Sequence, residues 1–273
     1  ERHLDRALPL YEQWGVEGVM VDFLERDDQH MVNFVRRLVK KAAEHRLTVT
    51  LHNCAKPTGL RRTYPNLLST EAVLNLEWNK WGDRGSRGST PAHELTVPFT
   101  RMLAGPLDYH SGGFRSVRQE DYVARNIAPL VMGTRAHHLA MYVVYENPMP
   151  MLADHPAAYR GQVGFDFLAR VPTTWDETQF VGGEIGEHIT VARRKGRDWY
   201  VGTMGGAAGR EVSIPLAFLP TGVEYAAEIW SDGPEAQPTV ALRRQLTVMS
   251  GDAIAATLSP AGGHVVRLTP SKS

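Results

Sequence analysis

The sequence has a single cysteine, no excess of charge of either sign and no long apolar run. Because Cys54 stands alone among 273 residues, no disulfide can form within the chain. Lys plus Arg and Asp plus Glu each total 30, so no global field favours nucleic acid or an anionic membrane. No apolar run reaches the roughly 18 residues that span a bilayer. The sequence also lacks HExxH, GxGxxG and Walker patterns, which argues against a zinc-protease site and a nucleotide cofactor.

Alternating strand and helix patterns fill the first part of the chain. Val16 to Phe23 form a short, mostly apolar run, which is typical of a strand covered on both faces. Apolar spacing predicts helices that alternate with such strands, and this order predicts βαβ units and a parallel sheet. We expect helices over 4–14, 28–42 and 122–145, and strands over 16–22, 47–53 and 72–79.

The pattern changes near residue 180. Short strand-like runs follow, separated by turns rich in Gly, Pro and Asp, and "RKGRD" between two such runs indicates a hairpin. This pattern predicts a small antiparallel sandwich. The first part offers three or four strands, which are too few to close an eight-stranded barrel.

Polar residues gather where the expected parallel strands end. Asp22, His52, Asn53 and Glu77 hold such positions, and ligands bind at the carboxyl ends of parallel strands. Trp residues at 78 and 81 follow Glu77 closely in the sequence. Such rings can stack on a sugar and can raise the pKa of a neighbouring acid by excluding water. The alternatives are a surface acid or helix cap at 22 and core packing for the two Trp side chains.

Two carboxylates at neighbouring strand ends can flank one glycosidic bond. A separation of roughly 5 Å permits a covalent route with retention, whereas roughly 6.5–9.5 Å leaves room for a water and gives inversion. Glu71 precedes Glu77 by six positions, and with the Asn53 side-chain oxygen these acids offer hard ligands for calcium. A solvated acid is the alternative for Glu71. His52 is expected to be a hydrogen-bonded pocket histidine, and His137 and His138 are expected to pack within an apolar helix.

Five stretches of the chain are distinctive, and in order they are "VMVDFLERDDQHMVNF", "LHNCAKPTGLRRTYPN", "STEAVLNLEWNKW", "VPFTRMLAGPLDYHSGGF" and "VPTTWDET". Together they resemble glycoside hydrolase family 97, a group of α-glucosidases and α-galactosidases. The resemblance implies an N-terminal β-super-sandwich, a central (β/α)₈ barrel and a C-terminal β-sandwich, of which this chain is similar to the later part. We therefore expect an α/β fold with the second half of a TIM-type barrel over 1–180, about strands 4 to 8, and an all-β antiparallel sandwich over 181–273.

The resemblance also implies roles for particular residues. Asp22 matches the nucleophile of the retaining branch, and Glu77 matches the general acid/base. Glu77 and Glu71 match ligands of a calcium ion, and a further ligand position falls near Asn53. From their positions in the sequence, and not from the resemblance, His52 and Lys56 are expected to contact the sugar, as is Trp78 from its ring beside Glu77.

The function implied is that of a retaining, exo-acting α-galactosidase or α-glucosidase. Two alternatives stay open. One is an inverting α-glucosidase, and the other is a catalytically incomplete fragment that acts only as a carbohydrate-binding or structural module. The expected partners are an oligosaccharide or α-glycoside substrate, together with self-association or the missing N-terminal half. The resemblance implies a periplasmic or secreted location.

Overall fold

The computed structural model describes residues 1–82, 85–233 and 237–271. The chain divides into two compact units that are interleaved along the sequence. The first comprises Glu1–Val73, Thr100–Tyr109 and Glu146–Met149, and the second comprises Leu74–Phe99, His110–Tyr145 and Pro150–Ser273. The sequence placed one boundary near residue 180, and the division into domains 1–180 and 181–273 stays a prediction.

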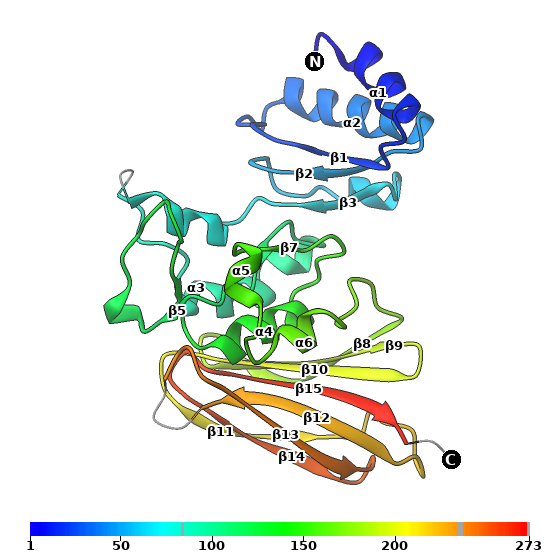
Figure 1. Ribbon diagram of the computed structural model, residues 1–273. Coiled ribbons are helices and arrows are strands. Elements are labelled where there is room, and N and C mark those ends of the chain that lie inside the picture. The colour runs from blue at the N-terminus through cyan, green and yellow to red at the C-terminus, as the bar shows by residue number, and fades with distance from the viewer. Residues whose placement is uncertain (83–84, 234–236, 272–273) are drawn as a thin grey trace. The chain divides into compact units, whose positions relative to one another are not determined.

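The first unit is built on a three-stranded parallel sheet (Figure 1). Its order is β1 (Gly18–Val21), β2 (Thr48–Leu51) and β3 (Leu67–Thr70). Helices α1 (Leu4–Gln13) and α2 (Gln29–Glu44) share one apolar core with the sheet. The 3-10 turn η1 (Leu60–Arg62) lies between β2 and β3, and η5 (Arg101–Ala104) belongs to the same unit.

Helix α2 illustrates how the local sequence determines an element. Asp28 caps the helix, because its Oδ1 accepts a hydrogen bond from the Met31 N–H at 3.0 Å. Phe34, Leu38 and Ala42 recur at helical spacing and are buried. The helix beginning at Asp28 is therefore confirmed, as are the first helix and the strand at 48–51.

Two expectations for this part of the chain are wrong. The strand at 18–21 is not covered on both faces, because none of its residues is fully buried and its Met20 is 44% exposed. The strand expected over 72–79 does not form. The third strand ends at Thr70, and Ala72 then adopts a left-handed φ of 40°, which turns the chain out of the sheet. Glu77 lies instead in the 3-10 helix η2 (Leu76–Lys80) of the second unit.

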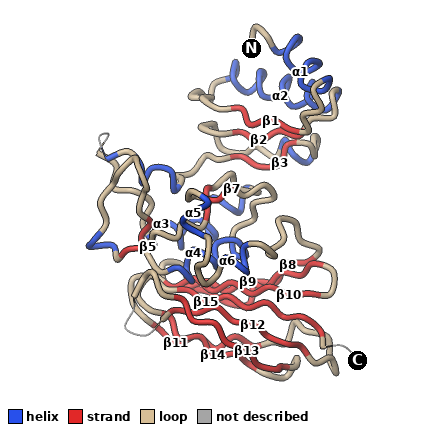
Figure 2. Tube along the Cα trace, in the orientation of Figure 1, coloured by secondary structure: helices blue, strands red, loops and turns tan. Residues whose placement is uncertain are grey.

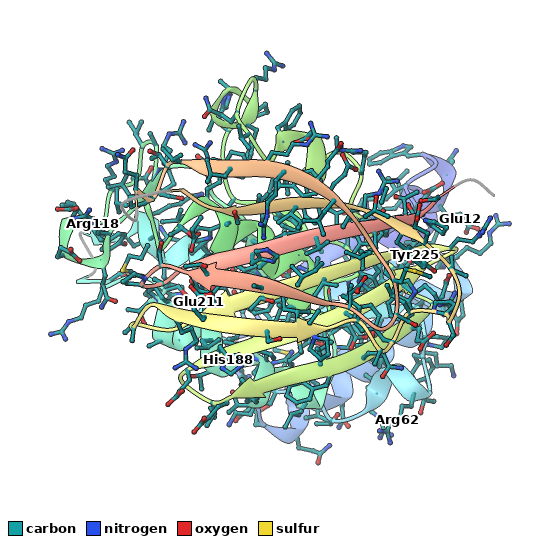
Figure 3. The ribbon with its side chains drawn as sticks, turned by 90° about the horizontal axis from the view of Figure 1, so that it is seen from below. Glu12, Arg62, Arg118, His188, Glu211 and Tyr225 are labelled. Carbon is teal, nitrogen blue, oxygen red and sulfur yellow. The ribbon has the colours of Figure 1, made fainter. Side chains whose placement is uncertain are left out.

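The second unit contains two antiparallel sheets. The larger has the order β13-β12-β15-β10-β9-β8, and β11 pairs with β14 (Figure 2). His188 and Tyr225, which begin β9 and β12, lie toward opposite ends of these strands (Figure 3). One apolar core contains buried side chains from both sheets. The strands are β8 (Glu177–Glu184), β9 (His188–Lys195), β10 (Asp198–Gly205), β11 (Arg210–Pro215), β12 (Tyr225–Asp232), β13 (Ala241–Val248), β14 (Ala253–Leu258) and β15 (Gly263–Pro270). The expected hairpin is confirmed as β9–β10.

Helix α4 (Arg135–Val144) packs directly on the larger sheet, and every one of its residues is buried. A Cβ on Gly202 of β10 would lie 2.8 Å from the Ala140 carbonyl oxygen, so only glycine permits this approach. Thr134 caps the helix by accepting from the His137 N–H at 3.1 Å. The helix expected over 122–145 is therefore too long, because the Thr134 cap sets its start and residues 131–132 pair as a short strand.

Short elements complete the second unit. The two-residue strands pair in parallel, β4 with β7 and β5 with β6. Their bounds and those of the remaining helices are α3 (Pro91–Thr96), η4 (Val97–Phe99), β4 (His110–Ser111), β5 (Ser116–Val117), η6 (Gln119–Asp121), β6 (Val131–Met132), β7 (Met151–Leu152), α5 (Pro156–Tyr159) and α6 (Phe165–Leu168). Within the described ranges, no helix has the length and apolarity required to cross a bilayer.

Candidate functional site

Each strand of the parallel sheet is followed at its carboxyl end by a polar residue. Asp22 follows β1, His52 follows β2 and Glu71 follows β3. Asp22 is exposed, and its Oδ1 accepts a hydrogen bond from the Phe23 N–H at 2.5 Å. The sheet topology therefore brings these three residues to the carboxyl-terminal end of the sheet, where parallel sheets bind ligands.

His52 lies between two carboxylates in the buried part of this end of the sheet. Its Nδ1 is 2.6 Å from Oδ2 of Asp108, and its Nε2 is 3.3 Å from Oε1 of Glu71. All three residues are at most 5% exposed. Polar contacts on both ring nitrogens hold the imidazole in a fixed orientation. The predicted hydrogen bonding of His52 is confirmed, and its place in a sugar pocket stays a prediction.

Asn53 and Glu71 are joined through the backbone. Oε2 of Glu71 accepts a hydrogen bond from the Asn53 N–H at 2.6 Å, while the exposed Asn53 side chain donates to Oε1 of Glu25 at 3.3 Å. Lys56 does not join this cluster. It is exposed and lines a separate cavity of about 310 Å³, to which neither His52 nor Glu71 contributes.

Glu77 in the second unit is positioned by a buried asparagine. Oδ1 of Asn75 accepts hydrogen bonds from the N–H of Leu76 at 2.8 Å and from the N–H of His110 at 2.9 Å. The first bond caps η2, which carries Glu77, and the second fixes the start of β4. Oε2 of Glu77 lies 3.9 Å from Nδ1 of His110, and both residues line a cavity of about 200 Å³.

The aromatic and histidine neighbours of the expected site have different roles. The Trp78 and Trp81 rings meet edge to face, with centroids 5.0 Å apart, and both residues are half-buried. His137 is fully buried, with Nε2 3.2 Å from Oε2 of Glu94. Burial lowers the pKa of the neighbouring His138 to about 4. The packing role predicted for the two histidines is confirmed.

Sequence reasoning missed the roles of Asn75 and His110. Asparagine two positions before Glu77 is a preferred N-cap residue, so a helical turn at this point had a readable signal. Nothing in the local sequence indicated that the same amide would bind the backbone of His110, which is 35 residues away.

The carboxylate and amide oxygens of the first unit suit a hard cation. Oε1 of Glu71 faces His52, Oε2 accepts from the Asn53 N–H, and an ionised carboxylate offers oxygen acceptors of the kind that a hard cation takes. Asn53 adds a neutral amide oxygen on an exposed side chain. Oxygen ligands of this kind are those that calcium takes, and the donor chemistry therefore fits part of a calcium shell.

Two family models match the chain. Residues 1–73 match the model described as glycoside hydrolase 97, and residues 174–269 match the one described as glycosyl-hydrolase 97 C-terminal, oligomerisation. The chain is 38% identical over 242 residues to a retaining α-galactosidase of Bacteroides thetaiotaomicron, which covers 86% of this chain and 35% of that protein. It is 29% identical over 269 residues to a probable retaining α-galactosidase of Streptomyces bingchenggensis, covering 96% of this chain and 39% of that protein.

A solved structure has the same fold over nearly the whole chain. A glycoside hydrolase family 97 enzyme from Pseudoalteromonas sp. strain K8, in complex with acarbose, matches with a TM-score of 0.89 and 31% identity. The match covers 99% of this chain and 45% of that one. The chain thus spans less than half the length of each of these relatives.

Proposed function

Because this chain belongs to glycoside hydrolase family 97, we propose that it carries the catalytic carboxylates of a retaining, exo-acting α-glycoside hydrolase of the α-galactosidase or α-glucosidase type. The observation that carries this proposal is the 38% identity with a retaining α-galactosidase over 86% of the chain. Solved relatives in complex with acarbose and panose support an oligosaccharide or α-glycoside as substrate.

In the proposed reaction, Asp22 is the nucleophile and Glu77 is the general acid/base. An Asp22 oxygen bonds to the anomeric carbon as the bond to the leaving oxygen breaks, and Glu77 gives its proton to that oxygen. A water then attacks the anomeric carbon, its proton passes to Glu77, and the Asp22 carboxylate departs. Two inversions at one carbon give net retention.

The exposed position of Asp22 supports the nucleophile role, because a nucleophile must reach the sugar. Glu77 is only about a fifth exposed and lines a cavity, which suits an acid that acts away from bulk water. Sugar contacts are proposed for His52, Lys56 and Trp78. Both ring nitrogens of His52 already face carboxylates, so its contact would come through the ring edge and through the acids that it orients.

We propose calcium as the cofactor, with Glu71, Asn53 and Glu77 among its ligands. When bound, calcium would supply positive charge that orients sugar hydroxyls and ligating carboxylates. His52 and the Asn53 backbone would keep the Glu71 carboxylate in a fixed orientation whether or not the ion is present.

The finer architecture is also a proposal. We propose that the short parallel strands form the second half of a (β/α)₈ barrel, and that the antiparallel sheets form a C-terminal β-sandwich. Residues 174–269 match a family model whose description includes the word oligomerisation, and this match supports the proposal that the chain self-associates. A periplasmic or secreted location is proposed from the family resemblance.

A panel of aryl α-glycosides tests the proposed activity on this chain, with and without added calcium. We expect release of the aryl group from an α-galactoside or α-glucoside, and a slower rate after chelation. Calorimetric binding of the corresponding oligosaccharide without turnover of any aryl glycoside would contradict the enzymatic proposal and favour a carbohydrate-binding module.

A further inference from the structure

The first unit contains a cavity on the α2 side of its sheet, and Lys56 is the one residue of its lining that the proposed glycosidase chemistry also uses. Parallel strands are usually joined by an α-helix that covers the sheet, but only the three-residue turn η1 lies between β2 and β3. This gap leaves a space of about 310 Å³ beside α2. Its apolar lining includes Leu24, Val35, Leu51, Leu60 and Leu67.

The polar part of the lining has one sign of charge. Arg26, Arg36, Lys56 and Arg61 line the cavity, and no Asp or Glu does. Arg26 donates to Oδ2 of Asp28, and its charge is therefore partly balanced. Among the described residues, the other three cations have no acidic partner within 4.0 Å.

We propose that this cavity binds a small amphiphilic anion, namely an apolar ring or short chain that carries one carboxylate. The volume falls at the lower end of the range for small-molecule sites, which combine an apolar lining with a few polar groups. Burial of the apolar body would supply binding free energy, and Arg36 and Arg61 would bind the carboxylate by charge-assisted hydrogen bonds. A neutral sugar matches this lining poorly, since its hydroxyls would lose water against an apolar floor.

Calorimetric titration of this chain with 2-naphthoate, and with neutral 2-naphthamide, tests the proposal. We expect naphthoate to bind with one-to-one stoichiometry and the amide to bind about tenfold more weakly or worse. Added salt should lower the affinity for naphthoate and leave the affinity for the amide unchanged, because salt screens the charge of the cations. Equal affinity for the two compounds, or no naphthoate binding at millimolar concentration, would overturn the proposal.

Substitutions locate the binding. The double variant Arg36→Gln/Arg61→Gln should lower naphthoate affinity about tenfold or more and leave the amide unaffected. Arg62→Gln is the matched control, because Arg62 is an exposed neighbour of Arg61 (Figure 3). It does not line the cavity. Val32→Phe should weaken both ligands, since Val32 is a partly exposed part of the wall.

Circular dichroism checks that each variant is folded. If Arg62→Gln lowers the affinity as much as the double variant does, binding is not localised to the cavity and the inference fails. All of these readouts measure binding alone, so they are independent of whether the chain hydrolyses glycosides.

Discussion

A single buried amide joins the two segments around Glu77. Asn75 accepts hydrogen bonds from the N–H of Leu76 and from that of His110, and it is fully buried. Both donors lose this acceptor if the side chain is removed, so the 3-10 helix bearing Glu77 and the start of β4 would be held together less firmly.

We predict that Asn75→Ala lowers kcat for an aryl α-glycoside more than it raises KM, because Glu77 and Trp78 on η2 are displaced while the proposed contacts of His52 and Lys56 in the first unit are kept. Asn75→Asp retains an acceptor oxygen and should recover most of the lost rate. Steady-state kinetics of the two variants check this prediction. A wild-type kcat for Asn75→Ala would contradict the positioning role.

The nucleophile prediction also belongs to the residue scale. Asp22→Asn should reduce turnover about 10³-fold or more, because an amide oxygen is a poor nucleophile. The fold should be intact, since Asp22 is exposed and an Asn side chain can still accept from the Phe23 N–H. Asp27→Asn, at an exposed acid nearby, is the control and should retain activity.

At the scale of elements, α4 packs closely on the larger sheet. A Cβ on Gly202 would lie 2.8 Å from both the Ala140 carbonyl oxygen and Cβ of Val143. We predict that Gly202→Ala destabilises the chain by about 1–3 kcal/mol through overpacking, as measured by urea unfolding. Gly251→Ala is the control, because a Cβ there meets nothing within 4 Å. Equal stability of the two variants would show that the helix can shift without cost.

Buried histidines make the same pair of elements sensitive to acid. Burial lowers the pKa of His138 on α4 to about 4 and that of His264 on β15 to about 3, against an ordinary value near 6.5. The unfolded chain therefore binds more protons than the folded chain below pH 6.5. The stability that comes from neutral histidine is present above pH 6.5 and is lost as the pH falls toward 4.

We therefore predict that the free energy of unfolding falls between pH 6.5 and 4, and that His264→Leu reduces this fall. Neither ring nitrogen of His264 has a hydrogen-bond partner among the described residues, so the substitution removes no such bond. Chemical unfolding at several pH values checks this, with His30→Leu as the exposed control. A fall of the same size in wild type and His264→Leu would contradict it.

Elements specified by local signals could be predicted from the sequence. The Asp28 cap and the apolar spacing indicated α2. The "RKGRD" turn at 194–198 indicated the β9–β10 hairpin. The strand expected over 72–79 failed because the left-handed turn at Ala72 and the Asn75 cap outweigh an apolar run. In the candidate site, the contact of His52 with Asp108 joins residues 56 positions apart, and tertiary pairing of that kind has no local signature.

At the scale of the whole molecule, calcium binding should couple to unfolding. An ion that binds the folded chain and not the unfolded one stabilises it by mass action, so saturating calcium should raise the unfolding midpoint by about a few degrees. Differential scanning calorimetry with calcium and then with excess EDTA checks this prediction. Glu71→Gln should remove the shift, whereas Glu44→Gln, at an exposed residue at the end of α2, should leave it unchanged. A midpoint that calcium does not move would contradict the cofactor proposal.

The stereochemistry of hydrolysis tests the central claim most directly. Proton NMR during turnover of an aryl α-galactoside or α-glucoside by this chain reports which anomer is released before mutarotation. Double displacement through Asp22 predicts that the α-anomer appears first and that the β-anomer follows only by mutarotation. Initial release of the β-anomer would contradict the account, because it requires a single displacement by water.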